Sequence, residues 1–234
     1  MSESTDIIYR PFTWSDAGNT LSLLNKCAVE LNGAPDETIE TMSGFWKNLG
    51  DDLSKVVTLA VTPEGKVVGY TEIYDLNQPY VKKYSYGCVD SSYRKQGIGT
   101  ELVRRLVESA RERVALAPEG SRVVLLQDVN QKDVESQRLF TELGWELNRH
   151  FYTMTVEFNG VKPPEPVLPE GMVIRSIQPG EEALALRAAH EAFKDHWGHV
   201  DRPFEQFYER YMEDIKSQNN YDPSLWFMAM DGDE

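Results

Sequence analysis

The run Arg94-Lys-Gln-Gly-Ile-Gly99 combines residue types that could bind an anionic ligand. Gly97 and Gly99 lack a Cβ atom, so the backbone at these positions can approach a bound phosphate closely. A helical pattern of apolar residues follows directly. Successive N–H groups at the start of a helix, assisted by the helix dipole, can hold a pyrophosphate without a metal ion. We therefore predict a phosphate-binding loop here.

The segments before this loop are predicted from the spacing of their apolar residues. Leu21, Leu24 and Leu31 recur at helical intervals, and Pro63-Glu64-Gly65 separates two runs of strand-forming residues, which is typical of a hairpin. The predicted order is a strand at 7–11, helices at 15–31 and 37–49, hairpin strands at 56–62 and 66–74, and a strand at 84–89.

After the loop, the pattern predicts two helices and two strands. The first helix has an apolar stripe opposite its arginines, and the second ends at a glycine, a residue that favours helix termination. An unbroken apolar run predicts a strand buried on both faces. The ranges are a helix at 99–114, the buried strand at 122–127, a helix at 134–143 ending on Gly144, and a long strand at 145–158.

A proline-rich segment interrupts this pattern. It contains Pro163, Pro164, Pro166 and Pro169, which can neither sustain a helix nor join a central strand. We therefore predict one domain at 1–158, a linker at 159–170 and a second domain at 171–234.

The second domain resembles the start of the first. Val173-Ile-Arg175 resembles Ile8-Tyr-Arg10, and the stretch that ends at Gly232 resembles the one that ends at Gly65. The offsets are nearly constant, because 175 minus 10 is 165 and 232 minus 65 is 167. We interpret this as an internal duplication. A second glycine loop would fall near position 262, so we expect a partial second unit whose last strand lacks a partner or pairs elsewhere.

Composition narrows the function classes. The 24 Lys and Arg residues against 38 Asp and Glu give a formal charge of −14, which disfavours binding to nucleic acid or to an anionic membrane surface. The sequence contains neither a membrane-span pattern nor a signal-peptide pattern, so we expect a cytoplasmic protein. The only cysteines, Cys27 and Cys88, lack zinc-site spacing, so no metal is expected.

The layout from Ile7 to Phe158 resembles that of GNAT acetyltransferases. The run from Val89 to Thr100 resembles the family's fourth strand and pyrophosphate loop, and Phe140-Thr-Glu-Leu-Gly-Trp resembles the end of its later helix. Dinucleotide-binding and P-loop patterns are absent from the sequence. The resemblance implies an α/β (α+β) GNAT fold, with a mixed, mostly antiparallel sheet flanked by helices, and a tandem arrangement like that of mycothiol synthase.

The resemblance also implies acetyl-CoA as the acyl donor. In the family, backbone groups of the fourth strand align the pantetheine arm, and amides of the loop hold the pyrophosphate. The residues that correspond here are Gly87, Cys88, Val89, Arg94, Lys95, Gln96, Gly97, Ile98, Gly99 and Thr100.

Direct acetyl transfer to an amine requires a base, a donor to the oxyanion and an acid. For the base we favour Glu72, because a carboxylate beside an apolar cleft has a raised proton affinity. A solvent-facing strand position for Glu72 stays open, as do Asp75 and Asp90 as alternative bases. The backbone N–H of Val89 is the family-like oxyanion donor.

The later helix departs from the family pattern at two positions. Phe140 stands where family members commonly carry the tyrosine that protonates the leaving thiolate, so Tyr93, Tyr152 or a water would take this role. Asp133 stands where an asparagine often contacts the cofactor. We expect Asn130 to reach the cofactor instead, although it could simply cap the helix or form a turn.

We therefore predict an acetyl-CoA-dependent N-acetyltransferase that acts on an amine of a small molecule or peptide. The alternative is a non-catalytic acyl-CoA-binding half of a tandem acyltransferase, which Phe140 would favour. A third alternative is a thiol-dependent enzyme built on Cys88. We expect no nucleic-acid or membrane partner, and a homodimer stays open.

Overall fold

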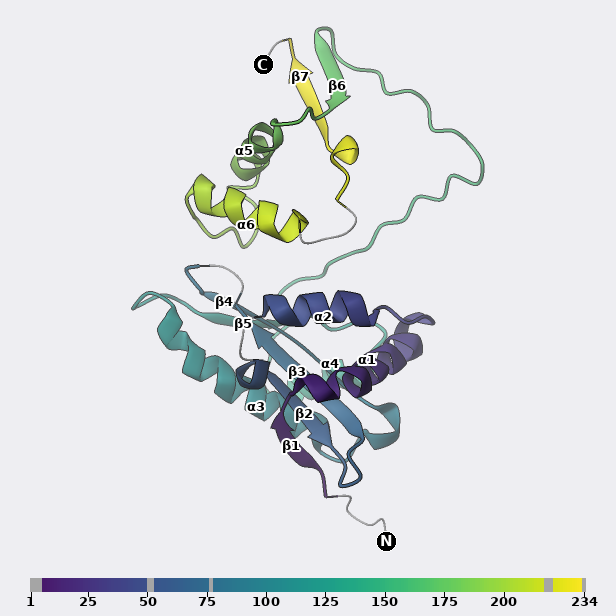
Figure 1. Cartoon of the computed structure of the whole chain (residues 1–234), viewed down its shortest axis with the longest axis vertical. Helices are drawn as coiled ribbons and strands as arrows, with labels where there is room; N and C mark the ends of the chain where they lie inside the picture. The colour runs from purple at the N-terminus through teal and green to yellow at the C-terminus, as the bar shows by residue number, and fades with distance from the viewer. Residues whose placement is uncertain (1–5, 50–52, 76–77, 217–220, 233–234) are drawn as a thin grey trace. The chain divides into compact units, whose positions relative to one another are not determined.

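The computed structural model describes residues 6–49, 53–75, 78–216 and 221–232 (Figure 1). Contacts within the chain divide it into two compact units, Met1–Arg149 and His150–Glu234. Within the described part of the chain, no helix is both long enough and apolar enough to cross a membrane.

The first unit is built on a five-stranded sheet with the order β1-β2-β3-β4-β5. All neighbouring strands are antiparallel except β4 and β5, which run parallel. This mixed, mostly antiparallel sheet confirms the predicted fold class. The strands are β1 (Ile8–Pro11), β2 (Val57–Val61), β3 (Val67–Tyr74), β4 (Lys82–Val89) and β5 (Val124–Gln127).

The hairpin between β2 and β3 forms where its turn residues predict it. Gly65 has a φ of 89°, a left-handed conformation that glycine adopts without strain. Its N–H donates to the carbonyl of Thr62 at 2.9 Å, and the N–H of Thr62 donates to Lys66 at 2.9 Å. The pairing of β2 with β3 shifts by one residue between Ala60 and Val61, at the end of β2 next to the turn.

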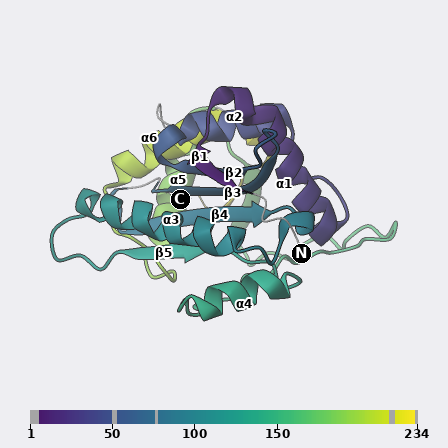
Figure 2. The same ribbon diagram turned by 90° about the horizontal axis from the view of Figure 1, so that it is seen from below.

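Helices cover both faces of this sheet (Figure 2). On one face, Tyr70 of β3 accepts a hydrogen bond from Trp46 of α2. On the other face, a Cβ atom at Gly69 would lie 2.9 Å from Leu102 of α3, so only glycine allows α3 to pack this closely on β3. The helices are α1 (Ala17–Asn32), α2 (Ile39–Asn48), α3 (Ile98–Glu112) and α4 (Val134–Glu142).

Two predictions for the end of the first unit are wrong. The strand predicted as buried on both faces is β5, whose residues are all half-buried and which pairs only with β4 in the described part of the chain. The predicted strand at Trp145–Phe158 is absent: residues 145–171 contain no helix or strand, and Met154 is 91% exposed. Trp145 alone packs against the core.

The second unit contains β6 (Met172–Ser176), α5 (Glu182–Ala192), α6 (Phe204–Lys216) and β7 (Phe227–Asp231). β6 and β7 form an antiparallel two-stranded sheet, so the last strand does have a partner. Nowhere in the described residues of either unit does a group of three or more His, Cys, Asp or Glu side chains lie so that it could hold a metal ion.

Candidate active site

The outer edge of β4 is open at its C-terminal half. β4 pairs with β5 only from Lys82 to Ser85, and no other described strand pairs with residues 86–89 on this edge. The N–H of Asp90 donates to Val68 of β3 at 2.9 Å. Because successive N–H groups of a strand point in opposite directions, those of Gly87 and Val89 point away from β3, toward the open edge.

The glycine loop continues this edge into the start of α3. Lys95 has a φ of 61° and Gly97 a φ of 81°, so two left-handed residues turn the chain into the helix. A Cβ atom at Gly97 would meet nothing within 4 Å, which leaves open space over the loop. The buried side chain of Ile98 anchors α3 in the core. The first N–H groups of α3 have no carbonyl partner within the helix and can bind an anion.

A cavity of about 600 Å³ lies along this edge and loop and is also lined by α1 and α4. Most of the residues predicted to bind the cofactor line it, but Gln96 and Ile98 do not. Glu72, the predicted base, does not line it either. The predicted residues that line the cavity are Gly87, Cys88, Val89, Arg94, Lys95, Gly97, Gly99, Thr100 and Asn130.

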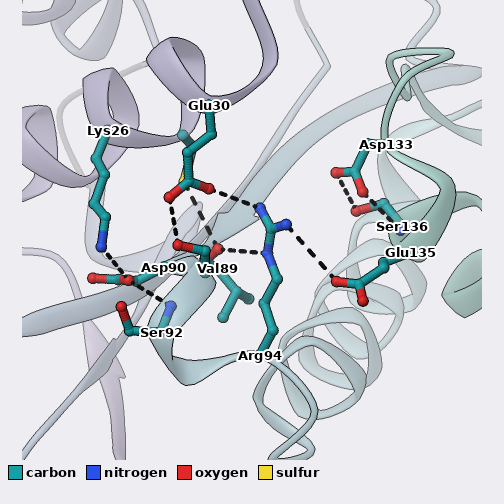
Figure 3. A network of polar contacts seen from close by, with 11 residues as sticks. Lys26, Glu30, Val89, Asp90, Ser92, Arg94, Asp133, Glu135 and Ser136 are labelled. Atoms are coloured by element: carbon teal, nitrogen blue, oxygen red, sulfur yellow. Dashed lines mark hydrogen bonds and ion pairs between the residues drawn. The ribbon is translucent and has the colours of Figure 1, made fainter.

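Both cations of the glycine loop form ion pairs with carboxylates, and Figure 3 shows those of Arg94. The Arg94 guanidinium lies 3.4 Å from the carboxylate of Glu30 in α1 and 3.8 Å from that of Glu135 in α4, and its Nε donates to the carbonyl of Val89 at 3.3 Å. The Nζ of Lys95 lies 2.9 Å from Glu135. The cations therefore connect α1, the loop and α4 at the cavity.

Glu72 is buried on β3, which excludes the solvent-facing alternative. It is 4% exposed and accepts a hydrogen bond from the hydroxyl of Tyr70. Burial raises the pKa of Glu72 from 4.5 to about 7, although the Tyr70 hydrogen bond lowers it. Tyr70 in turn accepts from Trp46 Nε1 at 3.0 Å, and it is one of the residues that line the cavity.

The two alternative bases are held in ion pairs. Burial alone would raise the pKa of Asp90, but hydrogen bonds from Lys26 and from the backbone N–H of Ser92 lower it to about 2. The Nζ of Lys26 lies 2.5 Å from Asp90. Asp75 lies 3.0 Å from the buried Lys83 and also pairs with Arg113. With its lowered pKa, Asp90 is a poor proton acceptor at neutral pH.

The position of the expected acid, Phe140, lies at the cavity, whereas the two tyrosines suggested in its place lie in different parts of the chain. Phe140 does line the cavity and packs edge-on against Trp145 with ring centroids 4.9 Å apart. Tyr93 packs against the small core cluster around Ile98, and Tyr152 is 79% exposed and belongs to the second unit.

Tyr86 is a candidate acid that the sequence analysis missed. It lies on β4, opposite Glu72 in the register, and lines the cavity. Burial raises the pKa of its phenol, so the hydroxyl keeps its proton at neutral pH. The alternation of Tyr84, Tyr86 and Cys88 on one face of the predicted strand was the signal that could have identified it.

The loop before α4 positions Asn130 at the cavity. The Nδ2 of Asn130 donates to the Oδ1 of Asn32 in α1 at 3.3 Å, and its own Oδ1 accepts from the N–H of Lys132 at 2.9 Å. Asp133 caps α4 by accepting from the N–H of Ser136 at 3.0 Å. Asp133 is therefore the helix cap, and Asn130 forms a turn beside the cavity.

The two thiols also line the cavity. Cys27 of α1 is buried, and its Sγ lies 3.8 Å from the carbonyl oxygen of Val89. A hydrogen bond with Cys88 of β4 lowers the pKa of Cys27, whereas the same hydrogen bond and burial raise the pKa of Cys88. Cys88 is thus the less reactive of the two thiols at neutral pH.

Comparisons with known proteins agree with this geometry. Residues 21–145 match the sequence model of the acetyltransferase (GNAT) family. Mycothiol acetyltransferase of Streptomyces scabiei (strain 87.22) is 27% identical over 208 residues, which cover 88% of this chain and 56% of that protein. The corresponding protein of Streptomyces bingchenggensis (strain BCW-1) is 28% identical over 179 residues, or 75% of this chain and 53% of its own.

A solved structure extends the likeness to three dimensions. The GCN5-related N-acetyltransferase from Sphaerobacter thermophilus aligns with a TM-score of 0.75 and 26% identity, covering 100% of this chain and 69% of that one. The chain spans about half the length of the curated relatives that it matches. Because the family model covers more than half of its residues, the chain belongs to the GNAT acetyltransferase family.

Proposed function

We propose that this chain transfers an acetyl group from acetyl-CoA to an amine of a small molecule or peptide. The observation that carries the proposal is the continuity of N–H donors along the cavity. The open edge of β4 at Gly87 and Val89 runs directly into the glycine loop and the first turn of α3. A ligand with an extended, amide-containing arm and an anionic end would match this order, with the arm along β4 and the anion at the loop.

The residues present fit this donor. N–H groups of Gly87 and Val89 can align the pantetheine arm as an added strand would align, and the amides from Lys95 to Thr100 can hold the pyrophosphate. When bound, acetyl-CoA supplies an acetyl thioester that an amine can attack directly. Open space over Gly97 leaves room for the phosphate groups.

Glu72 is the proposed proton acceptor. A carboxyl with a pKa of about 7 is partly ionised at neutral pH and can accept a proton from an ammonium or amine group. Because Tyr70 lines the cavity and donates to Glu72, its hydroxyl would pass the proton on, taking one at Oη and giving one to the Glu72 carboxylate.

Two further groups complete the proposed site. The N–H of Val89, which points to the open edge, can donate to the carbonyl oxygen on which negative charge develops. Tyr86 can protonate the leaving thiolate, because it lines the cavity and keeps its phenolic proton at neutral pH. Phe140, which has no proton to give, would pack against the arm instead.

The acceptor is inferred only as a chemical class. The relatives are named mycothiol acetyltransferases, so a mycothiol-related amine is the first acceptor to test. The formal charge of −14 on the chain also favours a cationic amine over an anionic acceptor.

The test has two parts. Acetyl-CoA should raise the melting temperature of the purified chain, because a ligand that binds only the native state stabilises it. A thiol-reactive dye should then report release of CoA in the presence of an accepted amine. No thermal shift at millimolar acetyl-CoA would contradict the proposal. A shift without thiol release across a panel of amines would instead support the non-catalytic binding half.

A further inference from the structure

The cations of the glycine loop already have an anionic partner within the chain. Glu135, in the first turn of α4, lies 2.9 Å from the Nζ of Lys95 and 3.8 Å from the guanidinium of Arg94. Figure 3 shows the Glu135 carboxylate on one side of the Arg94 guanidinium and the Glu30 carboxylate on the other. The positive charge that a pyrophosphate would meet is therefore balanced by two carboxylates.

These two carboxylates are held differently. Glu30 also accepts a hydrogen bond from the hydroxyl of Ser91, and its side chain is 30% exposed. Glu135 is 50% exposed, and both of its ion pairs in the described part of the chain are to the loop cations. Displacing Glu135 breaks these two contacts alone, whereas displacing Glu30 also breaks its hydrogen bond with Ser91.

The helix that carries Glu135 is held loosely. None of the residues of α4 is fully buried, although Leu139 contacts the start of α3. An element with few buried contacts shifts at low free-energy cost. Exposed ion pairs are themselves weak, so an anion with a higher charge can replace a carboxylate at the same cations.

We propose that Glu135 sets the affinity of the glycine loop for anionic ligands by occupying Arg94 and Lys95 until the ligand displaces it. The inference rests on the proposed function, because it takes the pyrophosphate of acetyl-CoA as the displacing anion. Glu135 is an affinity-determining residue in this scheme and takes no part in the chemistry.

Removing the carboxylate has a defined consequence. In Glu135→Gln, the cations stay in the loop without an internal anion, so acetyl-CoA should bind about threefold to tenfold more tightly at low ionic strength. The gain should shrink as KCl is added, since dissolved ions screen exposed charges. A purely structural role for Glu135 predicts the opposite, a loss of affinity with no such dependence on salt.

Glu108→Gln is the matched control. Glu108 loses the same charge, is similarly exposed at 53% and pairs with Arg104 on α3, but it lies about three turns from the loop. The control separates the local effect of Glu135 from the general effect of making an acidic chain less acidic. Its dissociation constants should equal those of the unchanged chain.

The experiment is calorimetric titration of the full chain with acetyl-CoA and, separately, with inorganic pyrophosphate at several KCl concentrations. Tighter binding by Glu135→Gln than by the unchanged chain and Glu108→Gln, for either probe, supports the inference. Equal or weaker binding of both probes by Glu135→Gln overturns it. Failure of the unchanged chain to bind acetyl-CoA contradicts the proposed function, and the pyrophosphate titration then still decides the role of Glu135.

Discussion

The two units of the chain begin in the same way. In the first, Arg10 of β1 forms hydrogen bonds of 2.7 and 2.6 Å with Asp16, which also accepts from the N–H of Thr13 at 2.9 Å. In the second, Arg175 of β6 forms bonds of 2.6 and 2.8 Å with Glu181. The N–H of Gln178 donates to Glu181 at 2.7 Å.

Each residue of the second arrangement lies 165 positions after its counterpart in the first. The pairs are Arg175 and Arg10, Gln178 and Thr13, and Glu181 and Asp16. We call this arrangement of arginine, backbone N–H and carboxylate the clasp. Its recurrence supports the internal duplication more strongly than the few identical residues do, because three separate contacts repeat at one offset.

The units differ in the elements that come after the clasp. In the first, the sheet continues through β3 and β4 into the glycine loop and the cavity. In the described part of the second, the sheet has two strands, β6 and β7. The clasp therefore belongs to the scaffold, and the proposed chemistry depends on the later elements of the first unit.

The largest expected effect is on acetyl-CoA binding, and it tests whether binding depends on the glycine loop. Gly97→Val places a β-branched residue at a φ of 81°, which strains the loop and displaces the amides of α3. Losing two charge-assisted hydrogen bonds would weaken acetyl-CoA binding by about a hundredfold or more. Calorimetric titration measures the effect.

Gly180→Val is the control for this change, because Gly180 has a φ of 94° just before α5 and belongs to the second unit. The strain is similar, but acetyl-CoA binding should persist. An equal loss of affinity in both variants would contradict the assignment of binding to the first unit.

The next largest effect concerns Glu72. Glu72→Gln removes the proposed base, and kcat for an accepted amine should fall by about a hundredfold. In the unchanged enzyme the rate should rise with pH to a plateau above about 7, because the ionised carboxylate is the active form. A variant with an unchanged kcat and the same pH profile would exclude Glu72 as the base.

Glu72 should also make stability depend on pH: the reaction rate should rise with pH, whereas the free energy of unfolding should fall. Its folded pKa of about 7 lies above the ordinary 4.5, so the folded state binds the proton more tightly than the unfolded state does. Stability should therefore fall as pH rises from about 4.5 to 7, by on the order of 3 kcal/mol. Urea unfolding of Glu72→Gln should lack this decline, whether or not Glu72 takes part in the reaction.

The clasps allow a direct comparison of the two units. Asp16→Asn should destabilise the first unit by about 1–3 kcal/mol, because the hydrogen bond to Arg10 holds the pKa of Asp16 at about 2 and the side chain is buried. Glu181→Gln should have a smaller effect, because the Glu181 side chain is 25% exposed, against 9% for Asp16.

Hydrogen exchange read by mass spectrometry can assign each loss to its unit. Protection should fall in α1 for Asp16→Asn and in α5 for Glu181→Gln. The depressed pKa of Asp16 also predicts that its contribution is lost as pH falls from about 4 toward 2. A larger loss of stability in Glu181→Gln than in Asp16→Asn would contradict the prediction that the clasp of the first unit contributes more.

Local signals explain what could be predicted from the sequence. The hairpin at Gly65 and the loop at Gly97 depend on contiguous residues, and both glycines adopt the left-handed conformation. The clasp was detectable in principle, because an acidic residue follows each arginine by six positions. Its two acids differ in type, Asp16 and Glu181, so a search for identical residues passes over them.

Signals that depend on a distant partner were less reliable. Trp145–Phe158 is rich in aromatic residues, Thr and Val, which favour strands, but a strand also requires a neighbour that pairs with it. The register of β7 is another example. Arg175 pairs with Met228, and its counterpart Arg10 pairs with Leu59. The partner positions 228 and 59 differ by 169, two more than the 167 that separates Gly232 from Gly65. The position of Tyr86 at the cavity likewise depends on how β4 pairs with β3.

The smallest expected effect tests the position that departs from the family pattern. Phe140→Tyr adds a hydroxyl to a side chain that already lines the cavity and packs against Trp145. If Tyr86 supplies the proton, this hydroxyl is redundant, and kcat should change by no more than about threefold. In Tyr86→Phe, where the proposed acid is missing, the same substitution should restore part of the lost activity. Thiol release by the two single variants and the double variant measures this coupling. A large gain in the single variant Phe140→Tyr would mean that Tyr86 is not the acid, and that the first unit lacks a proton donor only because phenylalanine stands at position 140.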